Sequence, residues 1–269
     1  MAHTHHAGGM LMLDTLAAHS GLLGVSPAIK TGFCVIALVT CVAASDAVVG
    51  LFVALSMILI MRFPGKTSFS RILALLRIPM LFLTVSCLVI LLEISGNPMG
   101  IRQLRLGRFF LCITEHSLSR AVTLFFQAMG AVCCLYALSS TTPMPQLIEV
   151  FRRCHVPELV IELMYLIYRY LFVLLDVQRK LTTAASARLG YRGLRNSVCT
   201  AGRISGALLA SSFRRSNQCF DAMESRGYDG KLRFLSHTPA FQWQHLLTAA
   251  AYLLVLFIFV LFRKRVLCL

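Results

Sequence analysis

Four long stretches of this chain are almost wholly apolar, and they constrain the fold more than any other feature. They cover approximately residues 33–61, 72–92, 121–138 and 245–262. A transmembrane helix needs about 20 mostly apolar residues to cross the hydrocarbon core of a bilayer. The sequence therefore predicts a membrane protein built from helices.

The first of these stretches, residues 33–61, is too long for a single upright span. It breaks most naturally at Ala44-Ser45-Asp46, which divides it into two short spans or a tight hairpin. The prediction is therefore an all-α membrane protein with five transmembrane helices. Residues 95–116 are rich in glycine and arginine, and we expect a loop or a short strand pair there.

The overall composition supports the same class of protein. Hydrophobic residues make up 57% of the chain and charged residues only 14%, with 26 Lys and Arg against 11 Asp and Glu. An average soluble chain is about a quarter charged. Proteins that bind nucleic acid are basic but normally polar as well. The balance therefore favours a bilayer protein with basic cytoplasmic segments and no nucleic-acid partner.

The positions of the basic residues predict an orientation in the membrane. The long polar region 177–237 and the loop 62–71 are both basic and are expected in the cytoplasm. Five spans satisfy both placements and put the N-terminus inside, whereas six spans force loop 62–71 outside. Five spans leave Arg263-Lys264-Arg265 on the outer side, so six spans remain the alternative.

The chain is expected to have four parts. They are an N-terminal head (1–29), a bundle of four spans (30–140), a cytoplasmic or interfacial coupling domain (141–240), and a last transmembrane helix with a basic tail (241–269).

Within the third part, residues 146–155 are predicted to form an amphipathic helix. A second helix starts at Val156-Pro157 and runs to about residue 180; its four ionisable groups are too many for a span exposed to lipid. The basic region beyond is expected to form two further helices, at about 178–200 and 203–228.

Both of these basic elements have an arginine near the C-terminal end, followed by glycine: Arg188 with Gly190, and Arg226 with Gly227. Glycine after the last turn is a common helix stop. Such an arginine can be satisfied by the carbonyls of its own helix, or its planar fork can hold a carboxylate on a cytosolic partner. A row of small residues in the second element is expected to let two helices approach closely. Its members are Gly202, Gly206 and Ala210.

Two other sets of residues are candidates for chemistry. His3, His5 and His6 could bind a divalent transition metal loosely, but an unstructured terminus or an affinity tag is the preferred explanation. A membrane-embedded enzyme is one alternative function, and a stand-alone secondary transporter is another, although the inverted repeats of the latter are not evident. The candidate residues for the enzyme are Glu115, His116, Glu158, Glu162 and Arg169.

The segment Ala222-Met223-Glu224-Ser225-Arg226-Gly227-Tyr228 resembles the second Ala-Arg-Gly signature of the T components of energy-coupling factor (ECF) transporters, in the CbiQ branch. Residues 184–193 resemble the first signature, with Leu189 standing between Arg188 and Gly190. Weaker similarity extends over almost the whole chain. It includes Leu13-Asp14, residues 26–30, Thr141-Thr142-Pro143, Leu147, Val156-Pro157 and Tyr168-Arg169-Tyr170.

This resemblance implies a membrane scaffold of the bacterial inner membrane, which is not an enzyme and carries no cofactor of its own. Its partners would be two ABC ATPase subunits, which bind ATP and Mg, a CbiM-like substrate-binding membrane subunit, and a small accessory membrane subunit in some systems. The expected substrate is cobalt, with a nickel or vitamin importer as the alternative. The residues that inherit ATPase coupling, or close packing beside it, are Ala187, Arg188, Gly190, Ser225, Arg226 and Gly227.

Overall fold

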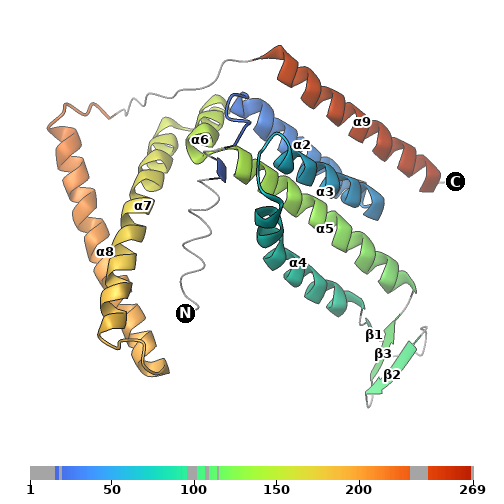
Figure 1. Ribbon diagram of the computed structural model, residues 1–269, viewed down its shortest axis with the longest axis horizontal. Helices are drawn as coiled ribbons and strands as arrows, with labels where there is room; N and C mark the ends of the chain where they lie inside the picture. The colour runs from blue at the N-terminus through green and yellow to red at the C-terminus, as the bar shows by residue number, and fades with distance from the viewer. Residues whose placement is uncertain are drawn as a thin grey trace. The chain divides into compact units, whose positions relative to one another are not determined.

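The computed structural model is dominated by helices α2 to α9 in the part of the chain that it describes (Figure 1). The described residues are 16–17, 20–91, 93–95, 102–106, 109–113, 115–230 and 242–267. They divide into two compact units. We call the described residues up to 147 and from 242 onward the membrane unit, and residues 148–230 the hairpin unit. The four-part division predicted from the sequence stays a prediction.

The membrane unit contains five apolar helices. They are α2 (Pro27–Ala44), α3 (Ala47–Arg62), α4 (Phe69–Leu91), α5 (Glu115–Thr141) and α9 (Trp243–Leu267). Among the described residues, all of these except α3 are long and apolar enough to cross a bilayer. The rise of α3 is about 24 Å, against a hydrocarbon core of about 30 Å. The prediction of an all-α membrane protein is confirmed, and the count of five spans stays a prediction.

The predicted break inside the first apolar stretch is present at Ser45 and Asp46. Ser45 ends α2 in the left-handed conformation, with φ of 48°. Asp46 then begins α3, since its carboxylate accepts a hydrogen bond from the Val48 N–H at 3.0 Å. This acceptor satisfies one of the N–H groups left free at a helix start.

The core of the membrane unit lies where α3 packs on α5. A Cβ atom on Gly50 would lie 2.5 Å from the Phe126 carbonyl oxygen, and one on Gly130 would lie 2.8 Å from the Gly50 oxygen. The two glycines therefore let the helix backbones approach more closely than any larger residue allows, which is a common form of helix packing in membranes. Val49, Val53 and Met57 of α3 are fully buried around this contact.

A small antiparallel sheet lies between α4 and α5 in the sequence. Its strands are β1 (Glu93–Ser95), β2 (Arg102–Leu106) and β3 (Phe109–Ile113), in the order β1-β3-β2. Glu93 is opposite Cys112 in one pairing, and Arg102 is opposite Ile113 in the other. The sequence allowed a loop or a strand pair here, and the structure has three strands.

Contacts at two levels, Tyr252 and Arg263, hold α9 against the rest of the membrane unit. The Tyr252 hydroxyl forms a hydrogen bond with Ser56, and its ring packs edge-on against Phe33 with ring centres 5.1 Å apart. Near the other end, Arg263 binds Asp46 through two hydrogen bonds: Nε donates to Oδ2 at 2.9 Å and Nη2 to Oδ1 at 3.0 Å. Such a two-point ion pair fixes orientation as well as distance.

The Asp46–Arg263 pair predicts a pH-dependent stability. The hydrogen bonds from Arg263, with that from the Val48 N–H, hold the pKa of Asp46 below its ordinary value of about 4. A lowered pKa contributes stability that is complete above the unfolded value and is lost as the pH falls through the folded value. We expect Asp46→Asn to lower the thermal unfolding midpoint of the solubilised protein at pH 7 and pH 5. The difference from wild type should shrink below pH ~4. A constant difference down to pH ~2 would contradict this assignment.

The hairpin unit consists mainly of α7 (Glu158–Ala187) and α8 (Leu194–Glu224), joined by residues 188–193. The amphipathic helix α6 (Met144–Arg153) spans the division between the units, and α7 follows Val156-Pro157, both as predicted. The boundaries predicted for the basic region are wrong. The chain turns at residues 188–193, and a single helix continues past Gly202.

The expectation that the small-residue row brings two helices together is also wrong within the described structure. A Cβ atom on Gly202 or Gly206 would meet nothing within 4 Å, and Ala210 is exposed. No residue of α8 is buried in the described chain. The row therefore faces outward, because α7 contacts a different side of α8.

Candidate functional site

The C-terminal end of α7 closes in a Schellman motif that places Arg188 at the helix cap. The Gly190 N–H donates to the Ala185 oxygen at 2.9 Å, and the Leu189 N–H donates to the Ser186 oxygen at 3.0 Å. These two bonds satisfy carbonyls that the helix end would otherwise leave free. Arg188 is exposed at this end.

The end of α8 has the same hydrogen-bond pattern, with Arg226 at the equivalent position. The Tyr228 N–H donates to the Met223 oxygen at 3.1 Å, and the Gly227 N–H donates to the Glu224 oxygen at 3.0 Å. Arg226 is also exposed. The shared pattern makes Arg188 equivalent to Arg226, and Leu189 equivalent to Gly227.

The two ends differ at the residue after the arginine. This position is left-handed in both, with φ of 57° at Leu189 and 75° at Gly227. The sequence pattern placed the first helix stop at Gly190, but the left-handed residue is Leu189. Gly190 instead allows close packing, since a Cβ there would lie 3.0 Å from Thr200 Oγ1.

We expect Leu189→Gly to stabilise the hairpin unit. A left-handed conformation costs a residue with a side chain about 1–2 kcal/mol. Glycine avoids this cost, but its greater freedom in the unfolded chain offsets about 0.5–1 kcal/mol of the gain. The Leu189 side chain is 64% exposed, so little packing is lost. The thermal unfolding midpoint should rise for Leu189→Gly and fall for the reverse change, Gly227→Leu. A fall for Leu189→Gly would show that its side chain has contacts that outweigh the strain.

Arg188 and Arg226 lie at opposite ends of the α7–α8 pair. The helices are antiparallel, joined by a short turn at one end and linked at the other by a hydrogen bond from the Tyr228 hydroxyl to Glu162 Oε2 at 3.3 Å. Arg188 lies at the turn and Arg226 beyond the far end of α8. Because α8 has 31 residues, the arginines are separated by about 45 Å, the rise of such a helix.

Side chains of α8 hold the turn that carries Arg188. Thr200 Oγ1 donates to the Gly190 oxygen at 2.8 Å, and Ser197 Oγ donates to the Gly193 oxygen at 2.9 Å. At the far end, burial and the Glu162 carboxylate raise the pKa of the Tyr228 hydroxyl above its ordinary value. The hydroxyl therefore stays protonated at neutral pH and can keep donating to Glu162, which is 7% exposed.

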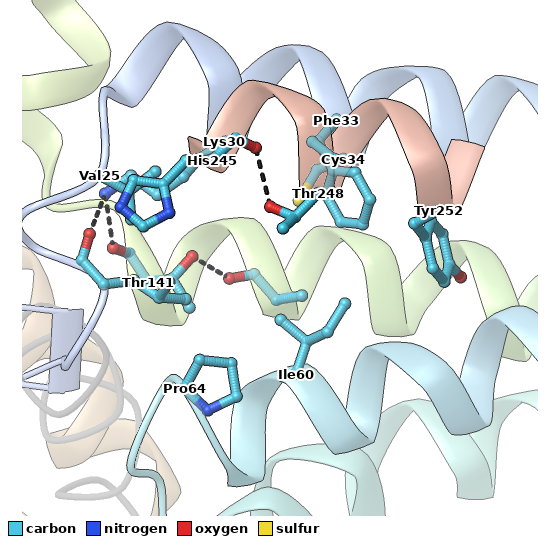
Figure 2. Close-up of a pocket in the computed structure, with 13 residues that line it drawn as sticks. Val25, Lys30, Phe33, Cys34, Ile60, Pro64, Thr141, His245, Thr248 and Tyr252 are labelled. Carbon is cyan, nitrogen blue, oxygen red and sulfur yellow. Dashed lines mark hydrogen bonds between the residues drawn. The ribbon is translucent and has the colours of Figure 1, made fainter. Parts of the chain in front are cut away.

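Lys30 forms a buried junction in the membrane unit that the sequence did not reveal. Its Nζ donates to the carbonyl oxygens of Leu22 and Thr141 at 3.1 and 3.2 Å (Figure 2). It also donates to Gln146 Oε1 at 3.0 Å. Ser20 Oγ also donates to the Thr141 oxygen, at 3.3 Å. One ammonium group thus joins the start of α2, the end of α5 and the first turn of α6. From sequence, Lys30 is a basic residue just before the first apolar stretch, in the segment 26–30 that resembles the family.

The remaining candidate residues do not gather at one site in the described structure. His3, His5 and His6 lie outside the described residues. The five residues considered for an enzyme are divided between the units, with Glu115 and His116 at the start of α5 and the others on α7. A cavity of about 420 Å³ in the membrane unit and one of about 380 Å³ between α7 and α8 include none of the five among their described lining residues. Among the described residues, no group of three or more His, Cys, Asp or Glu side chains could hold a metal ion.

Comparison with known proteins identifies the family. Residues 20–238 match the family model of CbiQ, described as cobalt transport protein. A fused cobalt transport protein CbiMQ of Methanocorpusculum labreanum is 32% identical over 219 residues, which are 81% of this chain and 37% of that protein. The cobalt transport protein CbiQ of Salmonella typhimurium is 30% identical over 57% of this chain and 68% of its own length. For CbiQ of Rhodobacter capsulatus the identity is also 30%, over 61% of this chain and 62% of the relative.

These matches agree with the residues that suggested the family, and with helices long enough to cross a bilayer several times. The matched range contains both arginine-bearing helix ends. The chain therefore belongs to the CbiQ family of cobalt transport proteins and is a multi-pass membrane protein.

Proposed function

We propose that this protein is the coupling (T) subunit of an ECF-type ABC importer for a divalent metal, with cobalt as the substrate. In this proposal two ABC ATPase subunits bind the hairpin unit, one at Arg188 and one at Arg226. ATP and Mg bind to those partners, and the chain itself contributes no catalytic group. The observation that carries the proposal is the pair of exposed arginines at equivalent positions of two helix ends.

The electrostatics of these helix ends suit an acidic partner. An arginine at a helix C-terminus is favoured by the helix dipole, and its planar fork can hold a carboxylate by two hydrogen bonds. Within the described part of the chain, no acidic residue forms an ion pair with Arg188 or Arg226, and both side chains are exposed, so their donors are accessible to a partner. Ala187 and Ser225, the residues before them, are small and exposed. A partner backbone can therefore approach each arginine closely.

A membrane subunit that binds the metal completes the proposed importer. The fused relative joins a CbiM part to a CbiQ part in one chain, which supports a CbiM-like protein as the partner here, with a small accessory membrane subunit as a further candidate. The hairpin unit and the N-terminus would then lie in the cytoplasm, and the bundle in the cell inner membrane. The metal is selected by the partner, so nickel remains the alternative to cobalt.

Capture of the ATPase from membranes tests this function. The full chain carries an affinity tag and is purified from membranes after co-expression with a candidate ABC ATPase subunit. We expect the wild type to retain the ATPase and the Arg188→Glu/Arg226→Glu double variant to lose it, because both attractions become repulsions. Arg203→Glu is the matched control, since Arg203 is exposed in the middle of α8. Equal capture by the double variant and the control would overturn the proposal.

A further inference from the structure

The cavity of about 420 Å³ in the membrane unit lies between helices α2, α3, α5 and α9 (Figure 2). Its volume is within the range of small-molecule sites, about 300–1,000 Å³. It lies at the level where α2 and α9 begin and α5 ends. These helices cross the bilayer, so this level is a membrane–water interface.

The two ends of this cavity differ in chemistry. Lys30 and His245 lie at the end near Val25 and Thr141, while Tyr252 lies at the opposite end. Phe33, Ile60 and Ala249 add apolar wall between them. The cavity is therefore elongated and apolar, with basic groups at one end.

The positive charge at the basic end lacks a neutralising carboxylate among the described residues. Lys30 is 7% exposed, and its three hydrogen bonds go to uncharged oxygens. Those bonds satisfy its N–H groups but do not neutralise its positive charge. None of the described lining residues is acidic. His245 adds a ring N–H donor, and Lys66 lies against Gly21, beside the lining residue Leu22. A charge held away from water attracts an opposite charge strongly.

We propose that this cavity binds one anionic phospholipid, with the phosphate at the Lys30–His245 end and an acyl chain along the apolar part. Basic pockets between transmembrane helices are the usual sites for anionic lipid headgroups. An acyl chain can fill the apolar part, but it leaves an equally apolar environment in the bilayer, so the headgroup supplies the selectivity. A free phosphate would use only the basic end, and a zwitterionic lipid would not neutralise the charge. The chemistry of both ends together therefore selects an anionic lipid.

The test measures lipid retention by the full-length chain after extensive washing in detergent. Phospholipids that stay bound are identified by mass spectrometry, and exchange is measured with phosphatidylglycerol, phosphatidylcholine and glycerol phosphate. Ala249→Phe fills the cavity from its wall. Ala250→Phe is the matched control, because Ala250 is the next residue of α9 and is exposed. His245→Leu removes the donor at the basic end without filling the cavity.

We expect the wild type and Ala250→Phe to retain phosphatidylglycerol, with weaker retention of phosphatidylcholine. His245→Leu should weaken retention of phosphatidylglycerol by about tenfold, since one hydrogen bond to a charged group is lost, and Ala249→Phe should abolish it. Equal retention by Ala249→Phe and Ala250→Phe would overturn the proposal, as would equal binding of the two lipids. Full competition by glycerol phosphate would overturn it as well, because the site would then bind anions without the acyl chain. If Ala249→Phe does not fold, unchanged lipid preference in His245→Leu decides against the proposal.

Discussion

Arg226→Glu is expected to abolish cobalt uptake while leaving the amount of protein in the membrane unchanged. The side chain is exposed at the end of α8 and has no role in the described core. Insertion and folding should therefore tolerate the change. At an acidic docking site, loss of one member of a desolvated charge pair costs about 2–5 kcal/mol, and reversal adds repulsion. Uptake should fall by at least about 100-fold, which corresponds to about 2.7 kcal/mol.

Uptake of radioactive cobalt by intact cells that express the complete importer measures this effect. Arg226→Lys should retain part of the activity, because lysine keeps the charge but lacks the two-point fork. Arg203→Glu, a reversal at an exposed position in the middle of the same helix, should transport normally. Full uptake by Arg226→Glu would remove Arg226 from the coupling mechanism.

Lys30→Met should destabilise the membrane unit. Methionine fills a similar space but leaves Gln146 Oε1 without the Lys30 donor, whereas the Leu22 oxygen keeps its bond from the Val25 N–H at 3.0 Å. A buried acceptor left unpaired costs about 1–3 kcal/mol, so we expect a loss of about 1–3 kcal/mol. The Thr141 oxygen keeps the bond from Ser20 and adds little to this loss.

The thermal unfolding midpoint and the rate of proteolysis near residues 142–147 measure this effect, since Lys30 connects α5 to the first turn of α6. Lys180→Met is the matched control. Lys180 is 76% exposed and pairs with Asp176 on the same helix at 2.8 Å, an interaction of about 0.3–0.5 kcal/mol. If both variants shift the unfolding midpoint equally, the Lys30 junction contributes no more to stability than the exposed Lys180 does.

The elements that could be predicted from sequence are those set by local chemistry. The break at Ser45 and Asp46 was evident because both residues favour helix ends over helix interiors. The apolar stretches predicted the membrane helices, since their length is set by the bilayer. Val156-Pro157 marked the start of α7, because proline is unfavourable inside a helix but accepted at its start.

The turn between α7 and α8 could not be placed because its key residue is atypical. Leu189 adopts a left-handed conformation that leucine rarely takes. Sequence signals favoured Gly190 or the glycines further along the chain as the helix end. The predicted helix boundaries therefore differ from those observed, where α7 ends at Ala187 and α8 begins at Leu194. The outward face of Gly202 and Gly206 was missed for a related reason: small residues indicate where a helix can be approached, but not whether the approaching helix belongs to the same chain.

The role of Lys30 depends on partners distant in the sequence. Its acceptor at Thr141 is 111 residues away, and Gln146 is 116 residues away. No local pattern contains that information. The same holds for Asp46 and Arg263, which are 217 residues apart. The charge rule treated Arg263 as a violation at the outer end of α9, whereas the structure neutralises it with Asp46.

The equivalence of the two arginine-bearing helix ends has a consequence for symmetry. An antiparallel pair of helices has an approximate two-fold axis across its middle, which exchanges the C-terminal end of α7 with that of α8. A single asymmetric chain thereby presents the same cap geometry twice, in opposite directions. Under the proposed function, two copies of one ATPase related by a two-fold axis would each meet an equivalent end without a second specialised subunit. The two caps differ at one position, which is Leu189 after α7 and Gly227 after α8. This position is where the environments of two identical partners would differ.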